Sequence, residues 1–185
     1  METHQNETVF FRCAFTGHRP KSLPYKYDES DGRCIALKEL LFRRVSQLYE
    51  RGVREFFCGM ALGCDTFFAE AVIRLKRVHS YLRLIACIPA EQTKFWKDDS
   101  VARYDTIIKE CDDVVDFGQV TPVIRSIFAR NEYMVDNCDI LICCILDSEM
   151  SGGTARTLRY AQKKNRMILK IDPASLKEEY VKLGE

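Results

Sequence analysis

The sequence predicts a doubly wound α/β domain with a mostly parallel sheet flanked by helices. Strand-like and helix-like segments alternate along the chain, as in proteins built from βαβ units. The segment Ile140–Leu146 is an unbroken apolar run, which is typical of a central strand buried on both faces. Five of the nine glycines lie in three short loops, and each loop follows a predicted strand.

The first half of the chain contributes three strands and two helices to this prediction. A first strand is expected over Val9–Phe15, and apolar residues at helical spacing predict a helix over Ile35–Arg51. A short strand over Phe56–Cys58 and a second helix over Thr66–Lys76 follow. The third strand spans Leu82–Ile88 and is ended by a proline.

The second half continues the alternation around the central apolar run. A helix is expected over Asp98–Cys111 and a short strand over Val114–Phe117. Pro122–Asn137 reads as a helix that opens on a proline, a residue favoured in a first helical turn. The last helix and strand are predicted over Thr154–Lys164 and Met167–Ile171.

The chain is expected to form one domain over residues 1–185, with a core of about residues 9–171. Its 185 residues suffice for one domain with a sizeable core, and no linker, repeat or low-complexity segment divides them. Residues 1–8 and 174–185 are then terminal extensions. The tail after Pro173 is rich in Lys and Glu and reads as a solvated helix.

Composition narrows the classes of partner. The formal net charge of +1 gives no electrostatic reason to expect nucleic acid or an anionic membrane. The polar amino terminus does not resemble a signal peptide, and no apolar run approaches the roughly 20 residues that span a bilayer. We therefore expect a cytoplasmic protein without a membrane partner, and we leave open whether it forms a homo-oligomer.

The nine cysteines are expected to be reduced and buried as small hydrophobic residues. Several lie within apolar strand-like runs, and no pair or Cys/His cluster has the spacing of a zinc site. The sequence thus predicts neither a metal ion nor a cofactor. Cys64 differs because it lies in a glycine loop before a helix, where its pKa could be lowered, although a packing role is favoured.

The first glycine loop carries groups suited to a phosphate or a ribose. Thr16 offers a hydroxyl, Gly17 permits close approach of the backbone, and His18 and Arg19 are hydrogen-bond donors. The structural alternative is an ordinary Gly-His turn leading into Pro20, with a solvated arginine.

The second glycine loop precedes a predicted helix. Gly59 and Gly63 are four residues apart and, with Met60 between them, permit a tight backbone cradle for a ligand. Asp65 either caps the helix that follows or binds ribose hydroxyls.

The third glycine loop is the best candidate for a phosphate site. Gly152, Gly153 and Thr154 follow the most hydrophobic strand and begin a helix, where backbone amides and the helix dipole favour an anion. The alternative is a flexible turn. Since parallel strands end at one edge of a sheet, the three loops should converge on one cleft for a phosphorylated small molecule.

Residues outside the glycine loops admit both structural and functional interpretations. Asn131 shares the apolar phase of its helix, so it is either hydrogen-bonded in the core or directed into the cleft. Glu91 and Trp96 follow the third strand on the expected ligand edge, where Trp96 would either stack on a base or pack under a helix. The long connection Pro20–Asp31 is either a binding loop or lid, or a solvated excursion ending in a helix cap.

Together these motifs resemble the YpsA-like family of bacterial proteins, which belongs to the SLOG superfamily with the Smf/DprA proteins and the Lonely Guy hydrolases. The resemblance covers about residues 9–171, and order and spacing both fit. It implies a Rossmann-like fold that binds a nucleotide or nucleotide derivative, without implying a reaction. The matching segments are Phe15–Pro20, Gly59–Asp65, Ile88–Gln92 with Trp96, Arg130-Asn131 with Met134–Asp136, and Gly152–Thr154 with Arg159–Ala161.

The hydrolase signature of the Lonely Guy proteins is not preserved. In the pattern P-G-G-x-G-T-x-x-E the glutamate is catalytic, and its position here is occupied by Arg159, which cannot act as a carboxylate but suits an anion. The favoured hypothesis is a non-catalytic ligand-binding or sensor module for a nucleotide. The alternatives are a nucleotide N-glycosidase (phosphoribohydrolase) using Glu91 or Asp65 and, less favoured, single-stranded DNA binding as in Smf/DprA.

Overall fold

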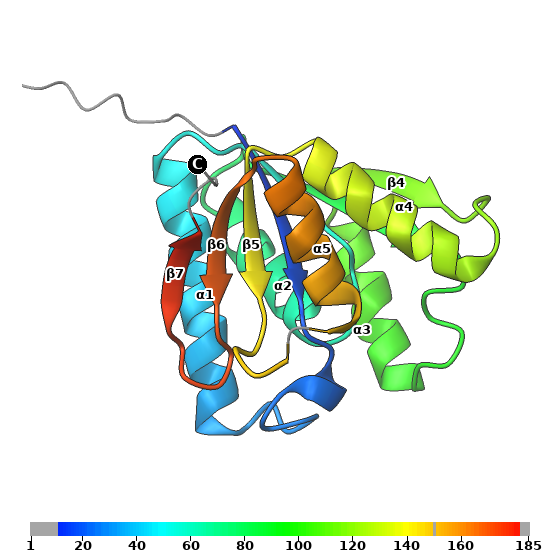
Figure 1. Ribbon diagram of the computed structural model, residues 1–185, viewed down its shortest axis with the longest axis horizontal. Helices are drawn as coiled ribbons and strands as arrows, with labels where there is room; N and C mark the ends of the chain where they lie inside the picture. The colour runs from blue at the N-terminus through cyan, green and yellow to red at the C-terminus, as the bar shows by residue number, and fades with distance from the viewer. Residues whose placement is uncertain (1–10, 150, 182–185) are drawn as a thin grey trace, which may run out of the picture.

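Seven strands form one sheet in the order β4-β3-β2-β1-β5-β6-β7 in a computed structural model that describes residues 11–149 and 151–181. Strands β1 to β6 are parallel, and β7 is antiparallel to β6 (Figure 1). This sheet confirms the predicted α/β class. The strands are β1 (Arg12–Gly17), β2 (Glu55–Cys58), β3 (Arg83–Pro89), β4 (Asp113–Phe117), β5 (Ile140–Cys144), β6 (Met167–Ile171) and β7 (Glu178–Val181).

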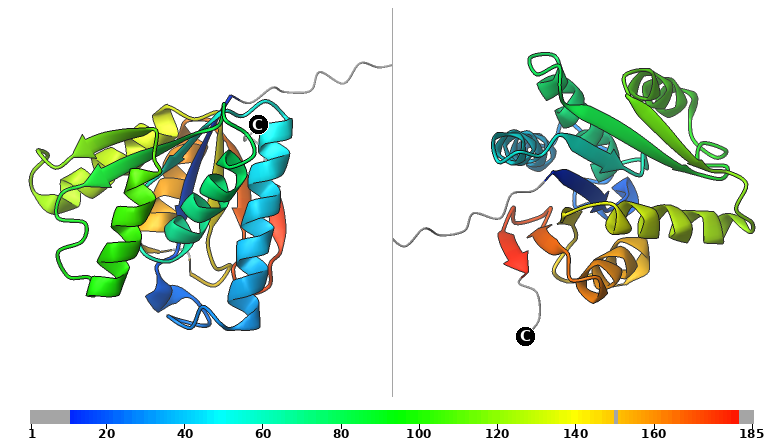
Figure 2. Two further views of the ribbon diagram at one scale, coloured as in Figure 1. Left: turned by 180° about the vertical axis from the view of Figure 1, so that it is seen from behind. Right: turned by 90° about the horizontal axis from the view of Figure 1, so that it is seen from above.

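Helices cover both faces of the sheet (Figure 2). The buried side chains of one group of helices belong to one hydrophobic cluster, and those of the other group belong to a second cluster on the opposite face. The first group consists of α1 (Gly32–Glu50), α2 (Cys64–Lys76) and α3 (Asp98–Lys109), and the second of α4 (Val123–Asp136) and α5 (Gly152–Lys163).

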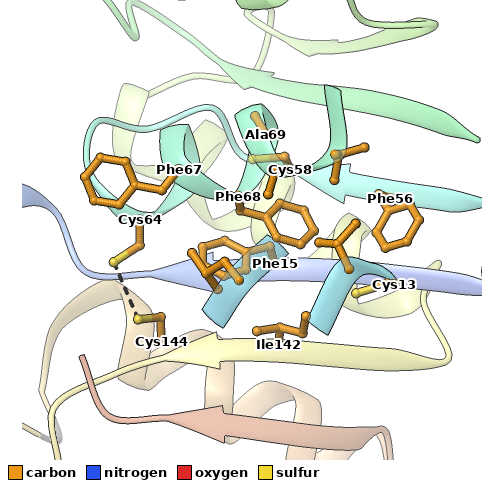
Figure 3. Packing of buried hydrophobic residues seen from close by; sticks show 14 of the residues in the cluster. Cys13, Phe15, Phe56, Cys58, Cys64, Phe67, Phe68, Ala69, Ile142 and Cys144 are labelled. Atoms are coloured by element: carbon orange, nitrogen blue, oxygen red, sulfur yellow. Dashed lines mark hydrogen bonds between the residues drawn. The ribbon is translucent and has the colours of Figure 1, made fainter. Parts of the chain in front are cut away.

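Side chains of the central strands alternate between the two clusters, as a strand buried on both faces requires. Phe15 and Phe56 lie in the first cluster, whereas Ala14 and Phe57 lie in the second. In the first cluster the ring of Phe15 stacks on that of Phe68 from α2, with centroids 4.5 Å apart (Figure 3). Burial of these aromatic rings holds α2 against the carboxyl half of β1.

The first strand lies further along the chain than the sequence predicts. Of the expected segment Val9–Phe15, the residues Val9 and Phe10 lie outside the described residues, and β1 continues to Gly17. Thr16 and Gly17 extend the strand because they pair with residues 143 and 144 of β5. The first glycine loop is therefore partly strand, which fixes its backbone.

The connection between residues 20 and 31 is packed against the body of the protein, so it is not the solvated excursion that was one of its two interpretations. It begins with a short 3₁₀ turn, η1 (Pro20–Ser22), and buries Leu23 and Tyr25 in the first cluster. The predicted cap is confirmed, because the Asp31 carboxylate accepts a hydrogen bond from the backbone N–H of Arg33 at 2.8 Å.

The prediction of a helix after Pro173 is wrong. Residues Glu178–Val181 form β7, which pairs with β6 through Ile168 opposite Val181. The unpaired backbone of β6 outweighs the local helical propensity, and the exposed position of an edge strand tolerates charged side chains. The Glu178 carboxylate also forms an ion pair with Arg44 of α1.

All nine cysteines lie in the described part of the chain as free thiols, eight of them buried and Cys111 half-buried. Burial raises the pKa of Cys13 and Cys58 well above the usual value. Cys64 is fully buried and its thiol lies 3.5 Å from the sulfur of Cys144 (Figure 3), which supports the packing role. Within residues 11–149 and 151–181, no cluster of His, Cys, Asp or Glu is arranged to hold a metal ion.

The described helices include none that is both long and apolar enough to cross a membrane.

The topology has a switch point between β1 and β5. From β1 the chain builds β2, β3 and β4 outward in one direction, and then returns to the other side of β1 to form β5. The connections that leave β1 and β5 therefore turn to opposite faces of the sheet. A topological switch point of this kind is where α/β proteins bind ligands.

Candidate functional site

A cleft of about 930 Å³ lies at the carboxyl ends of β1 and β5, beside the switch point. Its walls come from four parts of the chain that are distant in sequence: residues 16–22, the start of α2, one side of α4, and Glu149 with residues 151–159. The structure thus brings the first and third glycine loops together, as the sequence predicts. The second glycine loop contributes only Ala61 and Asp65.

The end of β1 forms the centre of the cleft. The backbone N–H of His18 donates to the carbonyl of Cys144 at 3.1 Å, and the His18 carbonyl accepts from the N–H of Cys64 at 3.2 Å. The hydroxyl of Thr154 in α5 donates to the Gly17 carbonyl at 3.1 Å. These bonds tie β5, α2 and α5 to the same two residues, so the geometry of the cleft is set by β1.

The imidazole of His18 is buried beside a carboxylate that the sequence analysis did not single out. His18 is 4% exposed, and its Nε2 atom lies 3.8 Å from Oε2 of Glu149 without a hydrogen-bond partner among the described residues. Burial lowers the pKa of His18 even though Glu149 and Asp172 act in the opposite direction. The neutral imidazole is therefore favoured near pH 7.

Asp65 and Arg130 form a buried pair at the base of the cleft. Oδ2 of Asp65 lies 3.8 Å from Nη1 of Arg130 and accepts a hydrogen bond from the Ala61 N–H at 3.3 Å. Burial raises the pKa of Asp65 to about 6 against the opposing charge of Arg130, and burial also lowers the pKa of Arg130. Both groups are charged at neutral pH.

One interpretation of the sequence makes Asp65 the cap of α2, and the structure shows that this interpretation is wrong. The cap position is taken by Gly63, and Asp65 lies within the first helical turn. Its carboxylate turns back toward Ala61 and Arg130. The other interpretation, a carboxylate available to a ligand, is the one compatible with its place in the cleft.

The glycines of the second loop make room for the protein itself rather than for a ligand, which corrects the predicted backbone cradle. A Cβ atom on Gly59 would lie 1.5 Å from Nη1 of Arg130. Gly63 has φ of +91°, and a Cβ there would lie 2.8 Å from the His18 carbonyl oxygen. Met60 is buried in the first hydrophobic cluster. None of these three residues lines the described cleft.

Gly17 is also required by packing. A Cβ atom at this position would lie 2.5 Å from Cβ of Cys64 and 2.9 Å from the ring of Phe15. Gly17 nevertheless lines the cleft, so its backbone remains accessible there.

The start of α5 is open to the cleft. Cβ atoms on Gly152 and Gly153 would meet no described atom within 4 Å, and Gly152 has φ of +79°. The cap residue Ser151 makes no side-chain hydrogen bond to the helix within the described structure. The first N–H groups of a helix have no partner within the helix, so this end of α5 is suited to an anion.

The described lining of the cleft carries more positive than negative side chains. The guanidinium of Arg156 lies 3.6 Å from the centre of the Phe128 ring and 3.6 Å from the carboxylate of Glu132. Arg159 is exposed and lines the cleft. The lining cations are Arg19, Lys21, Arg130, Arg156 and Arg159, and the lining carboxylates are Asp65 and Glu149.

One side of α4 forms a largely apolar wall. Ile124, Ile127, Phe128 and Met134 line the cleft at helical spacing. Asn131 is half-buried on this wall, which supports its interpretation as a cleft residue. A flat apolar ligand group would fit against this wall.

Glu91 and Trp96 lie apart from the cleft, contrary to expectation. Glu91 is exposed and pairs with Lys94 at 2.8 Å, while Trp96 packs edge-to-face on Tyr104 with ring centroids 5.5 Å apart. Both follow β3, which is separated from β1 by β2. The sequence places a loop at the ligand edge, but the order of the strands decides its distance from the switch point.

Sequence reasoning also missed residues that the structure places in the cleft. Arg130 was noted only within the family motif, although a charged residue in phase with Ile127 and Met134 on an apolar helix face is a usable signal. Lys21 lies in the short turn η1 and Glu149 in an irregular segment, where spacing gives no such signal.

Comparison with known proteins gives the same assignment as the motifs. The chain matches the family model YpsA, described as the YspA SLOG family, over residues 13–176. The chain belongs to this family. The YpsA match runs from the second residue of β1 to beyond the end of β6 and includes every described residue that lines the cleft.

Individual relatives are UPF0398 proteins of bacteria. The chain is 29% identical to one from Halalkalibacterium halodurans over 133 residues, which cover 70% of this chain and 69% of that protein. It is 26% identical to one from Bacillus thuringiensis over 157 residues, covering 83% of this chain and 84% of the relative. These names state no ligand and no reaction.

Proposed function

We propose that this protein is a cytoplasmic module that binds a nucleotide or nucleotide derivative in the cleft at the carboxyl ends of β1 and β5 without turning it over. The observation that carries the proposal is the open start of α5, where Gly152 and Gly153 leave the backbone accessible beside Arg156 and Arg159. Backbone amides, the helix dipole and arginine side chains all favour a phosphate at this place.

The rest of the cleft suits the remainder of a nucleotide. Its volume of about 930 Å³ falls in the range of small-molecule sites. The apolar wall of α4, including Phe128, offers contact area for a base. Asp65 and Arg130 supply buried polar groups at the base of the cleft, where a sugar would lie between phosphate and base.

The absence of turnover is proposed from the charges in the cleft. Arg159 stands where the resemblance places the catalytic glutamate of the Lonely Guy hydrolases. A guanidinium stays protonated and cannot accept a proton or stabilise a cationic sugar. It strengthens anion binding instead.

Asp65 favours a second candidate function, hydrolysis of the N-glycosidic bond of a nucleotide. Its carboxyl group is buried in the cleft and its pKa is raised to about 6, which is a suitable value for general acid–base chemistry near neutral pH. Glu91 lies apart from the cleft and is not proposed for this role.

Calorimetric titration of the purified protein with nucleoside mono-, di- and triphosphates tests the proposal. Chromatography of the same samples measures released base. Saturable binding without base release is expected. Base release at a rate that survives further purification would favour the hydrolase, and binding confined to a single-stranded oligonucleotide would favour the role of the Smf/DprA relatives. No binding of any nucleotide would contradict the proposal.

A further inference from the structure

The buried pair of Asp65 and Arg130 is incomplete as an ion pair. The two residues are 5% and 4% exposed, yet Oδ2 and Nη1 are 3.8 Å apart, which is too long for a hydrogen bond. Nε of Arg130 also has no hydrogen-bond partner in the described structure. Buried polar groups are normally hydrogen-bonded, so the guanidinium of Arg130 has unused donor capacity at the base of the cleft, while Oδ2 of Asp65 accepts one hydrogen bond, from the Ala61 N–H.

A ligand hydroxyl matches this capacity. An oxygen atom can lie about 2.8 Å from both Oδ2 and Nη1, where it donates a hydrogen bond to the carboxylate and accepts one from the guanidinium. A phosphate in the same position would be repelled by Asp65, and an ammonium group would be repelled by Arg130. The pair therefore selects a neutral group that is both donor and acceptor.

The anion-binding end of the cleft is separate from this pair but adjacent to it. Gly17 connects the two places, because its carbonyl accepts from the Thr154 hydroxyl of α5 at 3.1 Å. On its other side, Gly17 packs so closely on Cys64 that a Cβ would lie 2.5 Å from Cβ of Cys64, the neighbour of Asp65. A ligand with its phosphate at α5 thus has its next groups beside Asp65.

We infer that Asp65 and Arg130 form a subsite that hydrogen-bonds the sugar hydroxyls of the ligand and so selects ribonucleotides over 2′-deoxyribonucleotides. The inference rests on the proposed nucleotide binding. A vicinal diol offers one hydroxyl to the carboxylate and a second to bridge the carboxylate and the guanidinium. Loss of the 2′-hydroxyl leaves part of a buried charged pair unsatisfied, which is costly.

The test compares AMP, GMP, CMP and UMP with their 2′-deoxy counterparts by calorimetry on the full chain. For each ribonucleotide that binds, the 2′-deoxy form should bind about tenfold to a hundredfold more weakly, as for a lost hydrogen bond to a charged group. Equal affinities within twofold for each such pair would overturn the inference and leave the proposed function standing. No binding of any of the eight monophosphates would overturn the inference, whereas the proposed function is contradicted only when the di- and triphosphates also fail to bind.

Variants locate the selectivity. Asp65→Asn should bring the ribo and deoxy affinities within about twofold, chiefly by weakening the ribonucleotide, because an amide accepts more weakly than a carboxylate. Arg159→Ala should weaken both forms equally and preserve their ratio. Glu91→Gln, an exposed change outside the cleft, should alter neither. Selectivity retained in folded Asp65→Asn protein would overturn the assignment, and the wild-type ratio remains decisive if that variant does not fold.

Discussion

The guanidinium of Arg130 occupies the place where a side chain on Gly59 would begin. A Cβ atom built on Gly59 would lie 1.5 Å from Nη1 of Arg130 and 2.9 Å from Oδ2 of Asp65. The glycine that follows β2 therefore permits a buried arginine from α4 to approach a carboxylate on α2. Strand, helix and helix meet at this point beneath the cleft.

Gly59→Ala should lower the free energy of unfolding by about 1–3 kcal/mol, because the added methyl group forces Arg130 out of its buried position. The matched control is Gly32→Ala at the start of α1, where a Cβ would meet no described atom within 4 Å. Urea unfolding of both variants measures the difference. Equal stability of the two variants would contradict this packing relationship.

Gly153→Val should abolish nucleotide binding and leave the fold largely intact. The position is open, so the new side chain meets no described atom within 4 Å at its Cβ but fills space at the start of α5 that a phosphate needs. Circular dichroism checks the fold and calorimetry the affinity, with Gly32→Val as a control outside the cleft. Unchanged affinity in folded Gly153→Val protein would refute the placement of the phosphate.

Arg159→Ala should weaken nucleotide binding by about 1.5–3 kcal/mol, the size of a lost hydrogen bond to a charged group. Arg159→Glu should weaken it further, because it introduces a like charge beside the phosphate, and it should not by itself create a hydrolase. Arg51→Ala, an exposed arginine after the end of α1, provides the matched control. Equal affinities of the Arg159→Ala and Arg51→Ala proteins would exclude Arg159 from the ligand site.

Asp65 should make stability fall as pH rises from about 4 to 6. Its pKa is raised to about 6 in the folded protein, above the value of about 3.9 in an unfolded chain. A carboxyl group that holds its proton more tightly when folded contributes its full stability below about pH 4 and loses it as pH rises through its folded pKa.

The measurement is the free energy of unfolding at several pH values for the wild type and for Asp65→Asn. From about pH 4 to pH 6, the free energy of unfolding of the wild type should fall by on the order of 2 kcal/mol relative to that of Asp65→Asn. Because other titrating groups are common to both proteins, they largely cancel. A pH-independent difference would show that the pKa of Asp65 is not raised.

Thiol titration of the denatured protein, purified under argon, should find nine free thiols, and elemental analysis should find no stoichiometric zinc. In the folded protein only Cys111 is half-buried, and burial raises its pKa to about 12. Reaction of the native protein with a thiol reagent should therefore be slow. Rapid modification of several thiols, or near-stoichiometric zinc, would contradict this expectation.

Local patterns in the sequence were sufficient for the fold class and for part of the site. The unbroken apolar run from Ile140 predicted the buried β5, and one of the two interpretations of the connection before α1 made Asp31 the helix cap, as the structure has it. Gly152 and Gly153 pointed to the open start of α5. In each case the physical signal lies within a few residues, because apolar periodicity, capping and glycine turns are local interactions.

Only the tertiary structure decided which of the candidate residues meet. Glu91 and Asp65 both follow strands. Glu91 follows β3, which lies two positions from β1 in the sheet. Asp65 lies in α2, whose first residue, Cys64, donates a backbone hydrogen bond to the His18 carbonyl just after β1. The tail that reads as a helix becomes β7 because β6 offers an unpaired edge. The sequence predicts that Gly59 lies close to a ligand. In the structure the space beside Gly59 is filled by Arg130, which is 71 residues away in sequence. Strand order and close packing depend on contacts between distant segments, and spacing along the chain does not encode them residue by residue.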